Sequence, residues 1–125
     1  KMLPLICYEI IFPELSQRQK NLIVNISEDA WFGETIGPSQ HFAKAIFRAA
    51  ESNVYLARSA NKGFSAFINN KGVVKKALKT YERGTIELNV PFINNTHKKK
   101  KIDLIFFILL FTCVLSFIVL KKNEK

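Results

Sequence analysis

The apolar positions along this chain follow two different patterns. Up to about residue 93, short apolar runs alternate with turn residues, which is typical of an α/β domain. From residue 104 to residue 120, in contrast, the chain carries no charged side chain at all. The first pattern predicts β-strands over residues 3–6, 22–27, 54–60, 64–68, 73–78 and 85–90.

Two helices are predicted between these strands. The first begins near Tyr8 and is lost by about residue 19, with Pro13 in its first turns. The second covers residues 41–53, where apolar side chains recur at helical spacing. These side chains are Phe42, Ala45, Ile46, Ala49 and Ala50. Residues 29–39 are expected to form a loop, and residues 69–72 a hairpin turn in which Asn and Gly adopt positive φ.

The C-terminal part divides into three segments after the α/β part, residues 1–93. Residues 94–101 form a basic linker, residues 102–120 an apolar helix and residues 121–125 a lysine-rich tail. At about 1.5 Å per residue, the apolar helix reaches roughly 26–29 Å, close to a hydrocarbon core of about 30 Å. A buried core helix is the alternative. Lysines flank both ends, as at two membrane interfaces, so we predict a C-terminal transmembrane helix.

The charge balance is compatible with two kinds of partner. Lys and Arg number 19 against 10 Asp and Glu, which gives a net charge of +9. Such an excess fits nucleic acid or an anionic membrane surface. The lysine clusters are not interleaved with aromatic residues, as base stacking needs, and two of them bracket the apolar run. We therefore expect a membrane partner and no nucleic acid.

Cys7 is the residue whose position most suggests chemistry. It lies where the strand over residues 3–6 turns into the first predicted helix. A thiol at a helix N-terminus faces unpaired N–H groups and the positive end of the dipole, which lower its pKa and can hold an oxyanion. A lone Cys is also commonly a small buried apolar residue, so position alone leaves both roles open. The other cysteine, Cys113, lies in the apolar run, and we expect no disulfide.

Five short motifs occur in one order along the chain. Residues 6–9 (ICYE) with residues 12–14 (FPE) resemble the nucleophile segment of the nitrilase superfamily, whose members include carbon–nitrogen hydrolases. Residues 25–33 (NISEDAWFG) resemble the next segment as it occurs in bacterial apolipoprotein N-acyltransferases. The remaining three motifs are GPSQH at 37–41, RAAE at 48–51 and RSANKGFS at 58–65. The resemblance covers roughly residues 3–90.

The resemblance implies an α/β fold, here part of an α-β-β-α sandwich followed by the transmembrane helix. It also implies a Glu-Lys-Cys triad, with Cys7 as the nucleophile. The Cys thiolate attacks a phospholipid acyl donor, forms a thioester, and passes the chain to the N-terminal cysteine amine of a diacylglyceryl-lipoprotein acceptor. No metal or cofactor is implied.

Further residues match the family's site. Glu9 matches an acidic residue two positions after the cysteine, although a carboxylate at a helix N-terminus is an equally ordinary role. Tyr8, Trp31 and Phe32 match residues expected to bind substrate. Anchoring of the loop is an equally ordinary role for Trp31 and Phe32. Two departures from the family, Glu28 and Lys62, put the local loop geometry in doubt.

Five residues are expected to have structural roles. His41 is expected to be structural or at the surface, and Arg58 and Asn61 to be buried scaffold. Arg48 and Glu51 are placed to form an ion pair on one helix face.

The resemblance also bears on completeness and location. In the family, the base Glu and the Lys precede the cysteine, whereas only six residues precede Cys7 here. We therefore expect the start of this chain to be internal to a longer protein. We also expect this chain alone to be inactive. We expect the bacterial inner (cytoplasmic) membrane, with the catalytic domain on the periplasmic side, although the lysine count does not support that orientation. A soluble nitrilase-type amidase, or an inactive remnant tethered to a membrane, are the alternatives.

Overall fold

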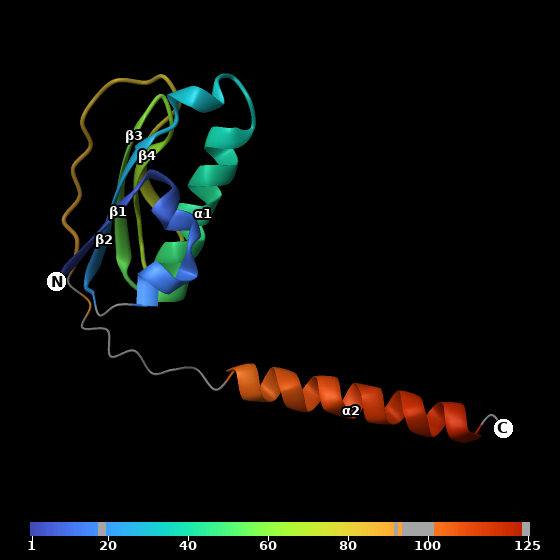
Figure 1. The fold of residues 1–125 in the computed structure, drawn as a ribbon. Helices are drawn as coiled ribbons and strands as arrows, with labels where there is room; N and C mark the ends of the chain where they lie inside the picture. Colours follow the sequence, from blue (N-terminus) through green and yellow to red (C-terminus); the bar gives the residue numbers. More distant parts are fainter. Residues whose placement is uncertain (18–19, 92, 94–101, 124–125) are drawn as a thin grey trace.

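A computed structural model describes residues 1–17, 20–91, 93 and 102–123 of the chain. In this part the strands form one five-stranded sheet, with helix α1 (Gly37–Ser52) packed on one face (Figure 1). The strands are β1 (Met2–Ile6), β2 (Leu22–Glu28), β3 (Tyr55–Asn61), β4 (Ser65–Ile68) and β5 (Val74–Leu78). Short 3-10 helices are η1 (Cys7–Ile11), η2 (Pro13–Gln17) and η3 (Ala30–Phe32).

The spatial order of the strands is their order along the chain, β1-β2-β3-β4-β5. The pairs β1–β2 and β2–β3 are parallel, whereas β3–β4 and β4–β5 are antiparallel. Parallel neighbours need a crossover. The turns η1 and η2 connect the first pair, and α1 connects the second. The carboxyl ends of β1, β2 and β3 therefore meet at one edge of the sheet.

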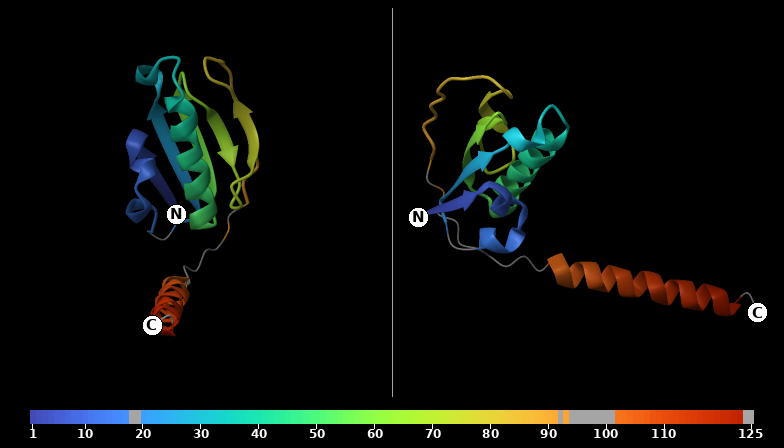
Figure 2. Two further views of the ribbon diagram at one scale, coloured as in Figure 1. Left: turned by 90° about the vertical axis from the view of Figure 1, so that its right-hand side faces the viewer. Right: turned by 45° about the horizontal axis from the view of Figure 1, so that its top comes forward.

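The core lies between the sheet and α1, which runs along the strands in Figure 2. Strand residues alternate, so every second side chain of β1, β2 and β3 points to this face, and each of these is buried except the half-buried Ala60 near the end of β3. Buried apolar residues are Leu3, Leu5, Ile10, Ile23, Ala45, Ala49, Val54, Leu56, Ala66 and Ile68. Of the predicted helical stripe, Ala45 and Ala49 are buried and Phe42 and Ile46 pack against them, whereas Ala50 is exposed.

The second face of the sheet is apolar and partly open. Met2, Ile6 and Ile26 on this face are 68%, 67% and 61% exposed. Residues 79–91 run over the face as an extended coil, on the side opposite α1 (Figure 1). An open cavity of about 280 Å³ lies between the sheet and this coil, and its lining includes Val24 and Phe67.

The predicted strands that correspond to β1–β5 are each correct to within one residue at either end. The strand predicted for residues 85–90 is wrong, because this stretch is coil. Its residues Thr85 and Ile86 line the cavity on the face of the sheet, and residues 85–90 form no hydrogen-bonded ladder with β5.

The helix predicted from Tyr8 to residue 19 is also wrong. The structure has η1 and η2 in its place, separated at Phe12. Pro13 has no N–H to continue a helical ladder, so the first turn closes with a bond from Phe12 N to the Glu9 carbonyl at 3.2 Å. The second predicted helix begins earlier, at Gly37 with Pro38 in its first turn, and shortens the expected loop.

Helix α2 (Ile102–Asn123) covers the predicted apolar helix and lies apart from the sheet (Figure 1). Within the described part of the chain, no helix has both the length and the apolar character needed to cross a membrane. The transmembrane helix is therefore not confirmed. The predicted linker, residues 94–101, lies outside the described residues, and the division of the chain into four segments stays a prediction.

Candidate active site

Cys7 lies in a strained turn at the edge where the three parallel strands end. It follows β1 directly, is half-buried and has φ of +47°. This left-handed conformation costs a residue other than glycine about 1–2 kcal/mol. Such residues persist only where the surroundings hold them, and they concentrate at functional sites.

Two hydrogen bonds hold the peptide groups on either side of this turn. The N–H of Ile6 donates to Glu9 Oε2 at 2.7 Å, and the carbonyl of Cys7 lies 3.2 Å from His41 Nε2. The Cys7 thiol lies 3.8 Å from the Glu28 carbonyl. The Glu9 carboxylate, although exposed, thus has a structural contact in the turn. Since η1 is only five residues of 3-10 helix, the dipole argument for Cys7 is weaker than the sequence suggested.

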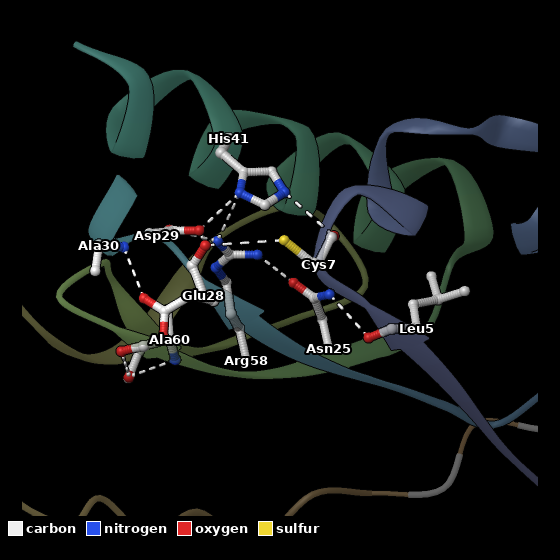
Figure 3. Close-up of polar contacts among 10 residues, drawn as sticks. Leu5, Cys7, Asn25, Glu28, Asp29, Ala30, His41, Arg58 and Ala60 are labelled. Atoms are coloured by element: carbon white, nitrogen blue, oxygen red, sulfur yellow. Dashed lines mark hydrogen bonds and ion pairs between the residues drawn. The ribbon is translucent and has the colours of Figure 1, made fainter. Parts of the chain in front are cut away.

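Asp29 is the centre of a buried polar cluster (Figure 3). Its Oδ1 lies 2.8 Å from His41 Nδ1, and its Oδ2 accepts a hydrogen bond from Arg58 Nη2 at 2.7 Å. The side chains of Asp29 and Arg58 are 0% exposed and that of His41 is 2% exposed. Asp29 therefore fixes both His41 and Arg58 without the help of solvent.

The same cluster reaches β1 at a second point. Arg58 Nη1 donates to Asn25 Oδ1, and Asn25 Nδ2 donates to the carbonyl of Leu5 at 3.0 Å. The strand register pairs Leu5 with Asn25 and Asn25 with Arg58, which aligns these groups across three strands. One polar path therefore begins at the Leu5 carbonyl and ends at the Cys7 carbonyl, two residues later on the same strand end (Figure 3).

The cluster also sets the ionisation of its members. Burial acts to raise the pKa of the Asp29 carboxyl, but the His41 hydrogen bond and the Arg58 charge together hold that pKa below its usual value. Burial lowers the pKa of the Arg58 guanidinium, although the Asp29 carboxylate opposes this shift. An ionised Asp29 is therefore the form that this site favours.

Glu28 ties the loop after β2 to the end of β3. Its Oε1 accepts a hydrogen bond from the N–H of Ala30, and its Oε2 accepts one from Asn61 Nδ2, both at 2.8 Å. The bonds from Asn61 and Ala30 lower the pKa of the Glu28 carboxyl. Glu28 thus has a defined role in this loop. Lys62, the other residue that departs from the family's motifs, has a left-handed φ of +55°. Asn61 is exposed, so its prediction as buried scaffold is wrong: it ends β3 and reaches outward to Glu28.

Aromatic rings surround His41. The Tyr8 ring stacks on the imidazole with centroids 5.2 Å apart, and the Phe32 ring meets it edge-on at 5.9 Å. Tyr8 and Phe32 are also 6.3 Å from each other. Trp31 is 78% exposed, and no ring contact of Trp31 occurs among the described residues. The structure therefore brings Cys7, Tyr8 and Phe32 together and leaves Trp31 at the surface.

Sequence reasoning missed part of this arrangement. Asp29 and Asn25 were not singled out as site residues, and His41 was given a structural role without a link to Cys7. The buried Arg58 and the ion pair of Arg48 with Glu51 agree with expectation. Among the described residues, no group of three His, Cys, Asp or Glu side chains is placed to hold a metal ion.

Comparison with known proteins gives one consistent family. The family model for carbon-nitrogen hydrolases matches residues 1–96. An apolipoprotein N-acyltransferase of Allorhizobium ampelinum is 40% identical over 124 residues, 93% of this chain and 24% of that protein. One of Rhizobium rhizogenes is 47% identical over 90 residues, 70% of this chain and 17% of that protein. The chain thus spans a quarter or less of these relatives.

Solved structures share the fold. A carbon-nitrogen hydrolase from Helicobacter pylori G27 superposes with a TM-score of 0.57 at 13% identity, covering 66% of this chain and 38% of that chain. An amidase from Nesterenkonia sp. gives a TM-score of 0.51 at 23% identity, covering 63% and 34%. These similarities support a nitrilase-like α/β fold with a mixed sheet.

Proposed function

The chain belongs to the carbon-nitrogen hydrolase family, and from that premise we propose that it is the C-terminal part of a membrane apolipoprotein N-acyltransferase. The Cys7 thiolate attacks the ester carbonyl of a phospholipid, the ester C–O bond breaks, and a lysophospholipid leaves. The N-terminal cysteine amine of a diacylglyceryl-lipoprotein then attacks the thioester, which forms an amide and releases the Cys7 thiolate. The names of the relatives supply the substrate class.

The strained turn at Cys7 is the observation that supports this role most directly. A cysteine that only filled space would have no need of φ +47°, or of a turn held by hydrogen bonds at the Ile6 N–H and at its own carbonyl. A half-buried thiol at the carboxyl ends of parallel strands lies where α/β proteins generally bind their ligands. We therefore assign the nucleophile to Cys7.

The surrounding residues fit supporting roles. Tyr8 and Phe32, which pack around His41 next to Cys7, supply apolar surface for an acyl chain, and the exposed Trp31 contacts the substrate further out. Glu9 stabilises the turn by accepting a hydrogen bond from the Ile6 N–H. Because Glu9 is only two residues after Cys7, we also propose that it acts on the substrate. His41 Nε2 faces the Cys7 carbonyl rather than the thiol, so we leave proton transfer to the Glu that the family resemblance implies elsewhere in the protein.

The proposal includes a membrane anchor at residues 102–120. The support comes from the sequence, since residues 104–120 carry no charge and lysines flank them on both sides. In the bacterial inner membrane this anchor would hold the sheet domain at the periplasmic surface, beside its phospholipid donor. Extraction of the protein from membranes by alkaline carbonate would contradict this part of the proposal.

The decisive experiment follows the acyl group. The protein is produced in membranes from its complete reading frame, supplied with phospholipid carrying an isotope-labelled acyl chain, and analysed by mass spectrometry. We expect a labelled thioester on the peptide containing Cys7, absent in Cys7→Ala and retained in Cys113→Ala, which removes the chain's other cysteine. A folded protein that forms no adduct, or that hydrolyses a small amide instead, would refute the acyltransferase.

A further inference from the structure

We propose that His41 is a positioning residue for Cys7, and that it acts through the Cys7 backbone carbonyl rather than through the thiol. This inference rests on the proposed role of Cys7 as the nucleophile. It concerns a residue that the motif resemblance left without a link to catalysis. The arrangement joins three parts of the fold: the turn after β1, the loop after β2, and helix α1.

The first argument is what His41 contacts. Its Nε2 lies 3.2 Å from the Cys7 carbonyl oxygen, across 34 positions of sequence. The Cys7 thiol has a different neighbour, the Glu28 carbonyl at 3.8 Å. An imidazole acting as general base would be directed to the sulfur. His41 instead holds the peptide group that carries the left-handed φ of Cys7.

The second argument is how firmly the ring itself is held. His41 is 4% exposed, and its Nδ1 lies 2.8 Å from Asp29 Oδ1. Arg58 Nη2 donates to Asp29 Oδ2 at 2.7 Å and lies 3.2 Å from His41 Nδ1. The Tyr8 ring covers one face of the imidazole, and the Phe32 ring meets it at an angle of 60°. A ring fixed on so many sides can impose one position on the carbonyl that it binds.

The hydrogen-bond roles follow from the atoms involved. The Cys7 carbonyl oxygen is an acceptor, so His41 Nε2 must carry a proton to bind it. His41 Nδ1 lies between an acceptor, Asp29 Oδ1, and a donor, Arg58 Nη2, so this nitrogen has a partner whether or not it carries a proton.

Two substitutions separate the two ends of this bridge. In His41→Gln the longer side chain places its amide near the position of Nε2, so it keeps a donor for the Cys7 carbonyl but loses the bond to Asp29. In His41→Asn the shorter side chain places its amide near the position of Nδ1, so it keeps the bond to Asp29 but falls short of the Cys7 carbonyl. Both are made in the protein from its complete reading frame.

Three measurements are compared in each variant. They are the rate of thioester formation on Cys7 from labelled phospholipid, the rate of alkylation by iodoacetamide at the peptide containing Cys7, and the unfolding temperature. We expect His41→Gln to stay within about threefold of wild type in both rates. We expect His41→Asn to lose about tenfold or more in both, because small misplacements of a reacting group have large effects on rate. A purely structural role would make the two rates follow the unfolding temperature.

The outcomes divide cleanly. Any result in which His41→Gln does not exceed His41→Asn by several-fold in Cys7 alkylation would overturn the proposal, including one in which both variants react like wild type. If wild type forms no acyl thioester, the acyltransferase assignment fails. The alkylation rates would then still decide the positioning role of His41 on their own.

Discussion

Asp29 is the single acceptor for two buried donors, and its replacement by asparagine tests how much this arrangement stabilises the domain. The side chains of Asp29 and Arg58 are 0% exposed, so water cannot take over from a missing partner. Asparagine keeps the shape and one oxygen, but presents an NH2 group where the second carboxylate oxygen accepted a hydrogen bond. Either His41 Nδ1 or Arg58 Nη2 then loses its carboxylate partner, and the Arg58 guanidinium, which keeps its bond to Asn25 Oδ1, loses its compensating charge.

We expect Asp29→Asn to lower the free energy of unfolding by about 3–5 kcal/mol, the usual cost of leaving one member of a buried ion pair alone. The matched control is Glu51→Ala. It also removes the acidic partner of an arginine whose side chain is only 6% exposed, but the Glu51 side chain is 54% exposed, so water already screens the carboxylate end of this pair. We therefore expect a smaller loss than for Asp29→Asn, about 1–2 kcal/mol.

The assay is pulse proteolysis in increasing urea, applied to the membrane protein produced from its complete reading frame. It reports the fraction unfolded without requiring activity, and the shift in midpoint gives the change in unfolding free energy. The reasoning would be refuted if Asp29→Asn unfolded within about 1 kcal/mol of wild type. An equal cost for Glu51→Ala would refute the distinction between buried and exposed pairs.

Three further predictions concern nearby features. Gly63→Ala should cost about 1–3 kcal/mol, because its Cβ would overlap the Asp29 carboxylate. Gly84→Ala, whose Cβ would meet only Leu78 at an ordinary contact distance of 3.5 Å, should stay within about 0.5 kcal/mol in the same urea assay. Gly72→Ala should cost about 1–2 kcal/mol because φ is +77° there, and a shift in urea midpoint would show it. Burial acts to raise the Asp29 pKa, but His41 and Arg58 hold it below its value in the unfolded chain. Wild type should therefore lose stability as the pH falls below about 4, and Asp29→Asn should lose less over that range; equal losses in a pH series of unfolding would contradict this.

The sheet could be predicted from the sequence because local pattern and final position agree there. The apolar runs of β1–β5 are bounded by turn residues, and each strand was correct to within one residue. Residues 85–90 carry a similar alternation, yet they run over the face of the sheet, and no local signal distinguishes a paired strand from such a coil. The helix after Cys7 failed for a local reason, the missing N–H of Pro13.

The site was predicted in part for a related reason. Cys7, Tyr8 and Phe32 belong to recognisable motifs, and the structure brings them together. The buried cluster depends instead on the pairing of β2 with β3, which aligns Asn25 with Arg58 across 33 positions of sequence. The contact of His41 depends on where α1 begins.

The predicted helix began at His41 itself. The actual helix begins at Gly37, and this places His41 one turn inside it, against the strained turn at Cys7. The membrane helix, the substrate class and the roles of all five candidate site residues, Cys7, Tyr8, Glu9, Trp31 and Phe32, stay predictions.

The strand order has a consequence for how this domain is made. Because each strand pairs with the strand synthesised immediately before it, the sheet can grow at one edge while the chain leaves the ribosome, within seconds per strand. The turn at Cys7 emerges before β2, but its carbonyl has no partner until His41 and α1 have followed. Ribosome-bound chains halted before α1 should therefore react with thiol reagents at Cys7 differently from chains halted after it, which makes the Cys7 thiol a reporter of co-translational folding.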